Sequence, residues 1–113
     1  MWNGRSKYHA KKTVVDGITF DSKREADRYL VLKSMEEDGT IEDLRRQVRY
    51  ELVPAFDVDG NHYRAVFYVA DFTYVDRETG EEIVEDVKGM RTDVYRLKSK
   101  LFARRYGKVI KET

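Results

Sequence analysis

An aspartate and a lysine lie two positions apart in the segment Val84-Glu85-Asp86-Val87-Lys88-Gly89. Alternate side chains of a strand share a face, so Asp86 and Lys88 are predicted to point together, about 7 Å apart, while Glu85 points away. Such a pair can hold a divalent cation and orient or deprotonate a water molecule beside it. An isolated Asp-x-Lys is more often an ion pair on a solvated strand, so the motif alone does not decide between these two interpretations.

Asp71 interrupts the longest β-rich run of the chain, residues 63–75. Aspartate is disfavoured in strands, and burying an unpaired charge costs several kcal/mol. The alternative is an edge-strand aspartate that faces water. Counting outward from Glu78-Thr79 pairs Asp71 with Asp86 on the next strand. Because adjacent carboxylates repel unless a cation lies between them, this pairing favours a metal site.

Glu25 lies at the start of the first predicted helix. It completes a capping box with Ser22, which requires no further chemistry. At 100° per residue it also shares a helical face with Tyr29 and Leu32, the side predicted to pack on a sheet. Glu25 is therefore a helix cap, a ligand of a metal on the sheet, or both in turn.

Lys98 lies within the apolar stripe of the second predicted helix, three residues after Tyr95 and four before Phe102. A lysine there either extends its charged end to solvent or reaches the site to contact phosphate. The stripe itself consists of Val94, Tyr95, Leu97, Leu101 and Phe102.

Turn signals and periodicity predict the elements that must position these residues. Asp16-Gly17 indicates a hairpin over residues 13–20, and Gly39 ends a helix that begins at Asp21-Ser22. The pattern continues with strands over 46–53, 63–75 and 82–88, a helix from Gly89 to Gly107, and a strand over 108–111. This order predicts a mixed α/β (α+β) fold with a central sheet. A basic arm, residues 1–12, would precede a single domain, residues 13–113.

Length and composition narrow the class of protein. The 113 residues fit one domain, and the absence of cysteine excludes disulfides, thiol chemistry and cysteine-bound zinc. No apolar run approaches the roughly 20 residues of a membrane span, and no secretory signal is recognised, so a cytoplasmic protein is expected. Residues 1–12 carry a net charge of +4 and residues 90–113 carry +6, whereas residues 13–89 carry −9. Basic ends could hold a phosphate backbone while the acidic middle holds cations, although solvated charge also segregates without function.

The motif residues together resemble the PD-(D/E)XK nuclease superfamily, whose core runs helix, three strands, helix, strand. Small phage-encoded proteins of this class are similar over residues 8–107. More distantly, the chain is similar to the endonuclease subunit of heteromeric transposases and to Holliday-junction resolvases. The segments that carry the resemblance are Tyr29-Leu30, Gln47-Val48-Arg49-Tyr50, Ala70-Asp71-Phe72 and Glu85-Asp86-Val87-Lys88-Gly89.

Two departures from the superfamily pattern are informative. Ala70 stands where the motif has proline, a common replacement. The Gln-x-x-x-Tyr signature of the exonuclease branch is absent from the second helix, which favours an endonuclease.

The resemblance implies a restriction-endonuclease-like α-β-β-β-α-β core with a leading hairpin. It implies that Asp71 and Asp86, with the Val87 carbonyl and Glu25, bind Mg²⁺, for which Mn²⁺ would substitute. Lys88 would position the attacking water or stabilise the phosphate, so the expected catalytic residues are Glu25, Asp71, Asp86 and Lys88. The residues expected to hold the nucleic-acid backbone are Arg5, Lys7, Tyr8, Lys11, Lys12, Arg91, Arg96, Lys98, Arg104 and Arg105.

Three functions remain open at this point. The first is a structure-selective DNA endonuclease, a phage Holliday-junction resolvase acting in DNA recombination as a homodimer in the host cytoplasm. The second is a nicking or transposase-like endonuclease whose target is set by a partner. The third is a non-catalytic nucleic-acid-binding protein on the same fold. None of the three involves an organic cofactor or a membrane.

Overall fold

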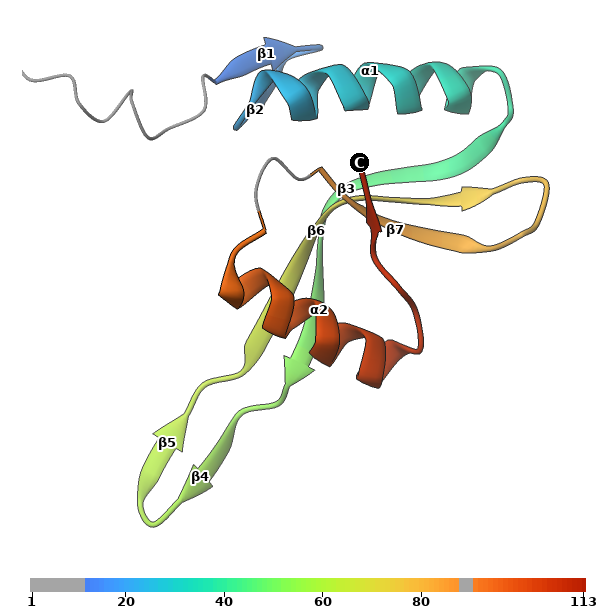
Figure 1. Ribbon diagram of the computed structural model, residues 1–113. Helices are drawn as coiled ribbons and strands as arrows, with labels where there is room; N and C mark the ends of the chain where they lie inside the picture. Colours follow the sequence, from blue (N-terminus) through green and yellow to red (C-terminus); the bar gives the residue numbers. More distant parts are fainter. Residues whose placement is uncertain (1–11, 88–90) are drawn as a thin grey trace, which may run out of the picture.

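The computed structural model describes residues 12–87 and 91–113, which form two helices and several short sheets (Figure 1). The α+β class predicted from the sequence is confirmed. In chain order the elements are β1 (Thr13–Val15), β2 (Ile18–Phe20), α1 (Lys23–Glu37), β3 (Ile41–Val53), β4 (Phe56–Val58), β5 (Asn61–Tyr63), β6 (Val66–Asp76), β7 (Glu82–Asp86), α2 (Asp93–Tyr106) and β8 (Lys111–Glu112).

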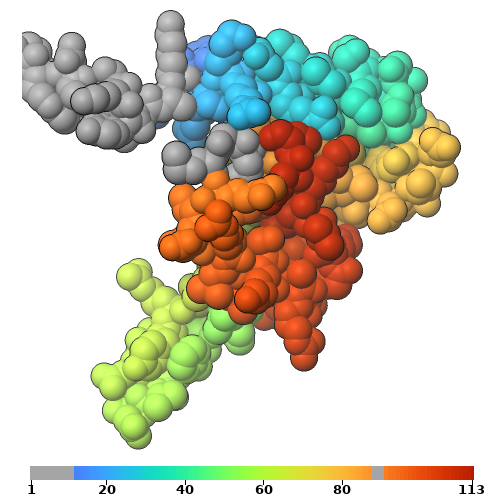
Figure 2. All heavy atoms as spheres, in the orientation of Figure 1, coloured from blue at the N-terminus to red at the C-terminus, as the bar shows by residue number. Residues whose placement is uncertain are grey.

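The main sheet has the strand order β3-β6-β7-β8. Its first three strands are antiparallel neighbours, and β8 runs parallel to β7 after the crossover through α2. With the hairpins β1–β2 and β4–β5 set aside, the elements follow one another as helix, three strands, helix, strand, the order that the sequence predicted. The β4–β5 hairpin continues β3 and β6 and projects away from the body of the protein (Figures 1 and 2).

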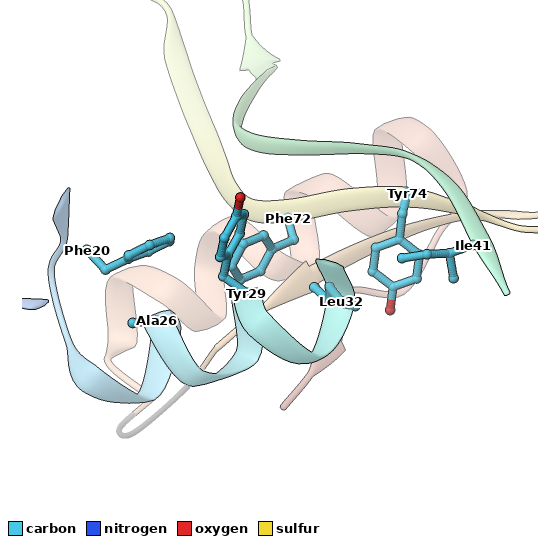
Figure 3. Packing of buried hydrophobic residues seen from close by; sticks show 7 residues of the cluster. All are labelled: Phe20, Ala26, Tyr29, Leu32, Ile41, Phe72 and Tyr74. Carbon is cyan, nitrogen blue, oxygen red and sulfur yellow. The ribbon is translucent and has the colours of Figure 1, made fainter. Parts of the chain in front are cut away.

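Two hydrophobic clusters hold the helices against this sheet. The first joins α1 to the sheet and contains Phe20, Ala26, Tyr29, Leu32, Ile41, Phe72 and Tyr74 (Figure 3). The second joins α2 to the sheet and contains Leu52, Tyr68, Ala70, Val84, Tyr95, Phe102 and Ile110. Strand β6 serves both, because Tyr68 and Ala70 belong to the second cluster and Phe72 and Tyr74 to the first. Asp71 lies at the changeover between them.

Local signals set the helix ends where the sequence placed them. The Ser22 side chain accepts a hydrogen bond from the backbone N–H of Glu25, 3.1 Å away, and so caps α1. Thr92 caps α2 in the same way. Gly107 ends α2 with φ of 66°, a left-handed conformation that glycine adopts without steric cost.

Several predicted boundaries were wrong. Strand β3 begins at Ile41 rather than at residue 46, because its first residues pair with the end of β6. The run 63–75 is divided after Tyr63, so that residues 61–63 belong to the β4–β5 hairpin and β6 starts at Val66. The last strand covers residues 111–112 rather than 108–111.

The helical stripe predicted for α2 was only partly correct. Tyr95 and Phe102 are buried, but Val94 is 63% exposed and Leu97 is 57% exposed. The face of α2 that packs against the sheet is therefore narrower than its apolar residues indicated.

Within the described residues, no helix is long and apolar enough to cross a membrane.

Candidate active site

The carboxylates of Asp71 and Asp86 lie next to each other at the end of the paired stretch of β6 and β7. The register pairs Phe72 with Glu85 and Thr73 with Val84, so the next positions in the same register are Asp71 and Asp86. This is the pairing that symmetric counting from the turn predicted. A short connection between antiparallel strands fixes their register, and residue types at the turn were enough to locate it.

Asp71 is half-buried, and its Oδ2 accepts a hydrogen bond from the backbone N–H of Val87 at 2.8 Å. Burial raises the pKa of Asp71 to about 7, opposed by the Val87 bond and reinforced by the nearby carboxylates of Asp86 and Glu25 and by a hydrogen bond with Asp86. A carboxyl with this pKa is a mixture of charged and neutral forms at pH 7. The site therefore holds more negative charge than it can fully stabilise by itself.

Asp86 is buried, with 4% of its surface exposed. Its Oδ2 accepts a hydrogen bond from the Tyr68 hydroxyl at 2.7 Å. Burial and this bond raise the pKa of Tyr68 above its usual value, so the phenol stays protonated and continues to donate. The hydrogen bond from Tyr68 therefore holds one oxygen of Asp86 in place and so orients the carboxylate.

Glu25 reaches the same region from the first turn of α1. Its Oε2 accepts a hydrogen bond from the Gln47 side-chain amide at 3.3 Å, and Arg46 Nη2 lies 3.9 Å from the same oxygen. Burial raises the pKa of Glu25, Arg46 opposes the shift, and the charges of Asp21 and Asp86 add to it. Ser22 caps the helix by accepting from the Glu25 N–H, while the Glu25 carboxylate contacts Gln47 and Arg46 of β3.

The backbone of β3 is distorted beside this cluster. Gln47 has φ of 53°, and the flanking pairs Arg46↔Phe72 and Val48↔Ala70 place it next to Asp71. A positive φ within a strand is strained for a residue other than glycine, and such positions concentrate at functional sites. It lets two consecutive side chains, Arg46 and Gln47, both reach Glu25.

A buried ion pair fastens α1 to β7 one position away from Asp86. Glu85 is fully buried and receives two bonds from Arg28, at 2.6 and 2.9 Å, and one from the Tyr74 hydroxyl at 2.7 Å. The hydroxyl of Thr113 adds a fourth at 3.1 Å. Glu85 thus points toward α1 while Asp86 bonds Tyr68, the alternation that the sequence predicted.

Asp71 and Asp86 form a pair of carboxylates of the kind that binds hard cations such as Mg²⁺. Within residues 12–87 and 91–113, no group of three or more His, Cys, Asp or Glu side chains could hold a metal ion. Mg²⁺ is usually held by one or two carboxylates and keeps several waters, so Asp71 and Asp86 match its requirements without a third side chain. The repulsion that raises the pKa of Asp71 is what a bound cation would relieve.

The structure distributes the predicted basic residues along α2 rather than gathering them. Arg91 forms an ion pair with Glu112, whose backbone is paired with Asp86, so this end of α2 lies near the carboxylates. Arg105 lies at the other end of the helix and bonds the Leu52 carbonyl of β3 at 3.5 Å.

The remaining predicted nucleic-acid contacts differ in exposure. Arg96 pairs with Asp93 on the surface of α2, Lys98 is half-buried, and Lys12 and Arg104 are exposed. The predicted catalytic Lys88 and the predicted contacts Arg5, Lys7, Tyr8 and Lys11 lie outside the described residues.

Comparison with known proteins adds a family to this geometry. Residues 5–113 match the family described as "Protein of unknown function (DUF1064)". The chain belongs to this family. No curated protein and no solved structure matches the chain significantly. The DUF1064 description names no activity, so the function must be argued from the residues themselves.

Sequence reasoning missed three side chains that hold the carboxylates in place: Arg46 and Gln47, which contact Glu25, and Tyr68, which contacts Asp86. A buried tyrosine three residues before Asp71 was a usable signal, because a buried hydroxyl needs a partner. The contacts of Arg46 and Gln47 join residues more than 20 positions apart and leave no trace in local spacing.

Proposed function

We propose that this DUF1064 protein is a Mg²⁺-dependent DNA endonuclease of the PD-(D/E)XK type, and that its substrate is branched DNA such as a four-way junction. The observation that carries the proposal is the juxtaposition of Asp71 and Asp86 on neighbouring strands, with the pKa of Asp71 raised to about 7. Packing two carboxylates together costs free energy unless something positive joins them. A catalytic cation site accounts for that cost.

Asp71 and Asp86 are the proposed ligands. The Val87 carbonyl and Glu25 complete the set that the superfamily resemblance implies. A cation held there would lower the pKa of a bound water and neutralise charge developing on the phosphate in the transition state. Lys88, two positions after Asp86, keeps its proposed role of orienting the attacking water.

The protein's own contacts define what each side chain contributes. Tyr68 donates a hydrogen bond to one oxygen of Asp86, and the Val87 N–H donates one to an oxygen of Asp71, so the protein orients both carboxylates. Arg46 and Gln47 hold Glu25 over the same part of the sheet. Preorganisation of this kind lowers the free-energy cost of assembling the site when substrate binds.

The test is cleavage of an end-labelled four-way junction beside matched duplex and single-strand controls, in Mg²⁺ and in EDTA. Paired nicks confined to the junction and seen only with metal are expected. Paired nicks require two active sites, so light scattering should then show a homodimer on the junction. Cutting of every substrate would keep the nuclease and remove the junction preference, leaving a partner to set the target.

The alternative is a nucleic-acid-binding protein without catalysis. Salt-dependent binding to the junction with no cutting in Mg²⁺ or Mn²⁺ would establish that alternative.

A further inference from the structure

Arg46 of β3 carries hydrogen-bond donors that no group in the described part of the chain accepts. Only 26% of its side-chain surface is exposed, and its guanidinium carbon lies 4.5 Å from the centre of the ring of Phe20, a member of the first cluster (Figure 3). Within residues 12–87 and 91–113 its guanidinium makes no hydrogen bond, and its Nε is buried without a partner. Since buried polar groups are nearly always hydrogen-bonded, such an unused donor group points to a ligand.

Arg46 lies beside the carboxylates of the candidate site. Its Nη2 is 3.9 Å from Glu25 Oε2, beyond hydrogen-bond length, whereas the Gln47 amide donates to that oxygen at 3.3 Å. Besides burial, the charge of Asp86 helps to raise the pKa of Glu25, and the charge of Glu25 helps to raise that of Asp71. The three carboxylates are therefore close enough to repel one another, and Arg46 places a positive charge at their edge.

The stacking on Phe20 prepares Arg46 for an anion that arrives from solution. Contact with the ring holds the planar guanidinium in one orientation, which lowers the entropy lost when its N–H groups bind a partner. Arginine donates such N–H groups in pairs to phosphate oxygens. Arg28, by contrast, already makes two hydrogen bonds to Glu85, so its donors are committed to the fold.

The proposed function brings one anion to Glu25, Asp71 and Asp86, the phosphate of the bond that is hydrolysed. Cationic donors aimed at the non-bridging oxygens of this phosphate stabilise the transition state. We infer that Arg46 donates hydrogen bonds to a non-bridging oxygen of the phosphate that is cut. The inference rests on the proposed nuclease function and adds a catalytic residue to Glu25, Asp71, Asp86 and Lys88.

The first test measures the salt dependence of junction binding by fluorescence anisotropy in EDTA, with Asp86→Asn as the parent so that nothing is cut. Adding Arg46→Gln should weaken binding about 10-fold, because a hydrogen bond to a charged group is lost. It should also reduce the slope of log K against log[salt] by about 0.9, the value for one phosphate contact. In the wild-type background, Arg46→Gln should slow cleavage about 100-fold in Mg²⁺.

The matched control is Arg77→Gln, which removes another arginine, one that is exposed and pairs with Glu42 at 3.7 Å. It should leave affinity, slope and cleavage unchanged. An Arg46→Gln slope equal to that of the parent, or an equal loss in Arg77→Gln, would overturn the inference.

A second test separates contact with the phosphate from an effect through Glu25. Glu25→Gln, in the same Asp86→Asn parent, removes the charge that Arg46 faces in the folded protein. If Arg46 contacts the phosphate, adding Arg46→Gln should still weaken binding about 10-fold. No further loss would mean that Arg46 acts only by positioning Glu25.

A third test locates the phosphate. A neutral methylphosphonate is placed at the linkage that the wild-type protein cuts. It should weaken binding of the Asp86→Asn parent about 10-fold, but not binding of the variant that also carries Arg46→Gln. An equal loss in both proteins would contradict the assignment.

Circular dichroism melts establish whether Arg46→Gln folds like its parent. If it does not, the methylphosphonate comparison is made with Arg46→Lys, which keeps the charge beside Phe20. The loss at the cut linkage should then be smaller than in the parent, because lysine lacks the paired N–H groups. Equal losses in these two proteins would again overturn the inference.

These outcomes separate the two proposals. If the wild-type protein cuts the junction and Arg46→Gln keeps the parent slope, the role of Arg46 is wrong and the nuclease stands. If Arg46→Gln lowers the slope but no substrate is cut in Mg²⁺ or Mn²⁺, the phosphate contact stands and catalysis fails. If no DNA binds at all, both are wrong.

Discussion

At the scale of single residues, the site is a place where folding and chemistry conflict. Asp71 occupies a strand position beside Ala70 and Phe72, which are fully buried, and its own carboxylate lies against that of Asp86. An apolar residue there would stabilise the sheet. Residues that violate the local rule without a structural gain concentrate at functional sites.

The raised pKa of Asp71 predicts a stability that falls with pH. Its carboxyl has a pKa of 3.8 as an ordinary aspartate and about 7 in the fold. Between these values the folded protein binds a proton that the unfolded chain has lost, so the free energy of unfolding decreases as pH rises from about 4 to 7. Asp71→Asn lacks this charge. In EDTA it should be about as stable as wild type at pH 4 and more stable by about 1–3 kcal/mol at pH 8.

Urea unfolding followed by circular dichroism at both pH values measures this difference. Asp59→Asn, in the exposed β4–β5 turn, is the control and should follow the wild type at each pH. An Asp71→Asn effect of the same size at pH 4 and pH 8 would contradict the assigned pKa.

At the scale of elements, the placement of Glu25 depends on how α1 is fastened to the sheet. The first hydrophobic cluster positions the helix, and the Arg28–Glu85 pair ties it to β7 beside Asp86. Since Arg28 and Glu25 are on the same helix, this pair also fixes the carboxylate of Glu25 relative to the sheet.

Arg28→Ala should therefore destabilise the protein by about 3–5 kcal/mol, because it leaves Glu85 buried without its partner. Lys23→Ala removes an exposed ion pair with Asp27 from the same helix and should cost no more than about 0.5 kcal/mol. Chemical denaturation compares the two. Equal losses would show that the buried pair does not fasten the helix. The double variant Arg28→Met with Glu85→Met should recover much of the loss.

How far the sequence predicts these elements depends on the distance over which each signal acts. Turn dipeptides such as Asp16-Gly17 and helix caps such as Ser22 act locally, and they led to the correct order of elements. The Asp71–Asp86 register followed because a short turn joins the two strands. The break between β5 and β6 falls at Arg64-Ala65, which contains no glycine or proline to mark it.

The parts of the site that sequence analysis missed are tertiary. Gln47 meets Glu25 only because β3 passes under α1, and its positive φ has no counterpart in its residue type. The exposure of Val94 and Leu97 is also a tertiary property, because residue spacing along α2 does not show which of its apolar side chains meet the sheet. The role of Lys88 stays a prediction.

At the scale of the whole molecule, the protein consists of a compact body and a projecting hairpin (Figure 2). Phe56 and Tyr63 stack on each other with ring centres 4.9 Å apart, yet they are 45% and 47% exposed. Neither belongs to the two clusters that hold the helices. The hairpin therefore contributes little to the stability of the fold.

Replacing residues 56–63 with Asn-Gly, a favoured two-residue turn, should change the free energy of unfolding by less than about 1 kcal/mol. Differential scanning calorimetry of the shortened protein tests this expectation. A loss above about 2 kcal/mol would mean that the hairpin supports the ends of β3 and β6, and that the body does not fold independently of it.

The central claim is that the carboxylate pair cuts DNA, and the most direct test compares Asp86→Asn with wild type on a labelled four-way junction in Mg²⁺. The substitution keeps the shape of the side chain and removes its charge. Cleavage should fall at least about 100-fold, as for loss of a principal electrostatic contact in an active site, while junction binding stays equal or becomes tighter. Cleavage by Asp86→Asn at the wild-type rate would contradict the account.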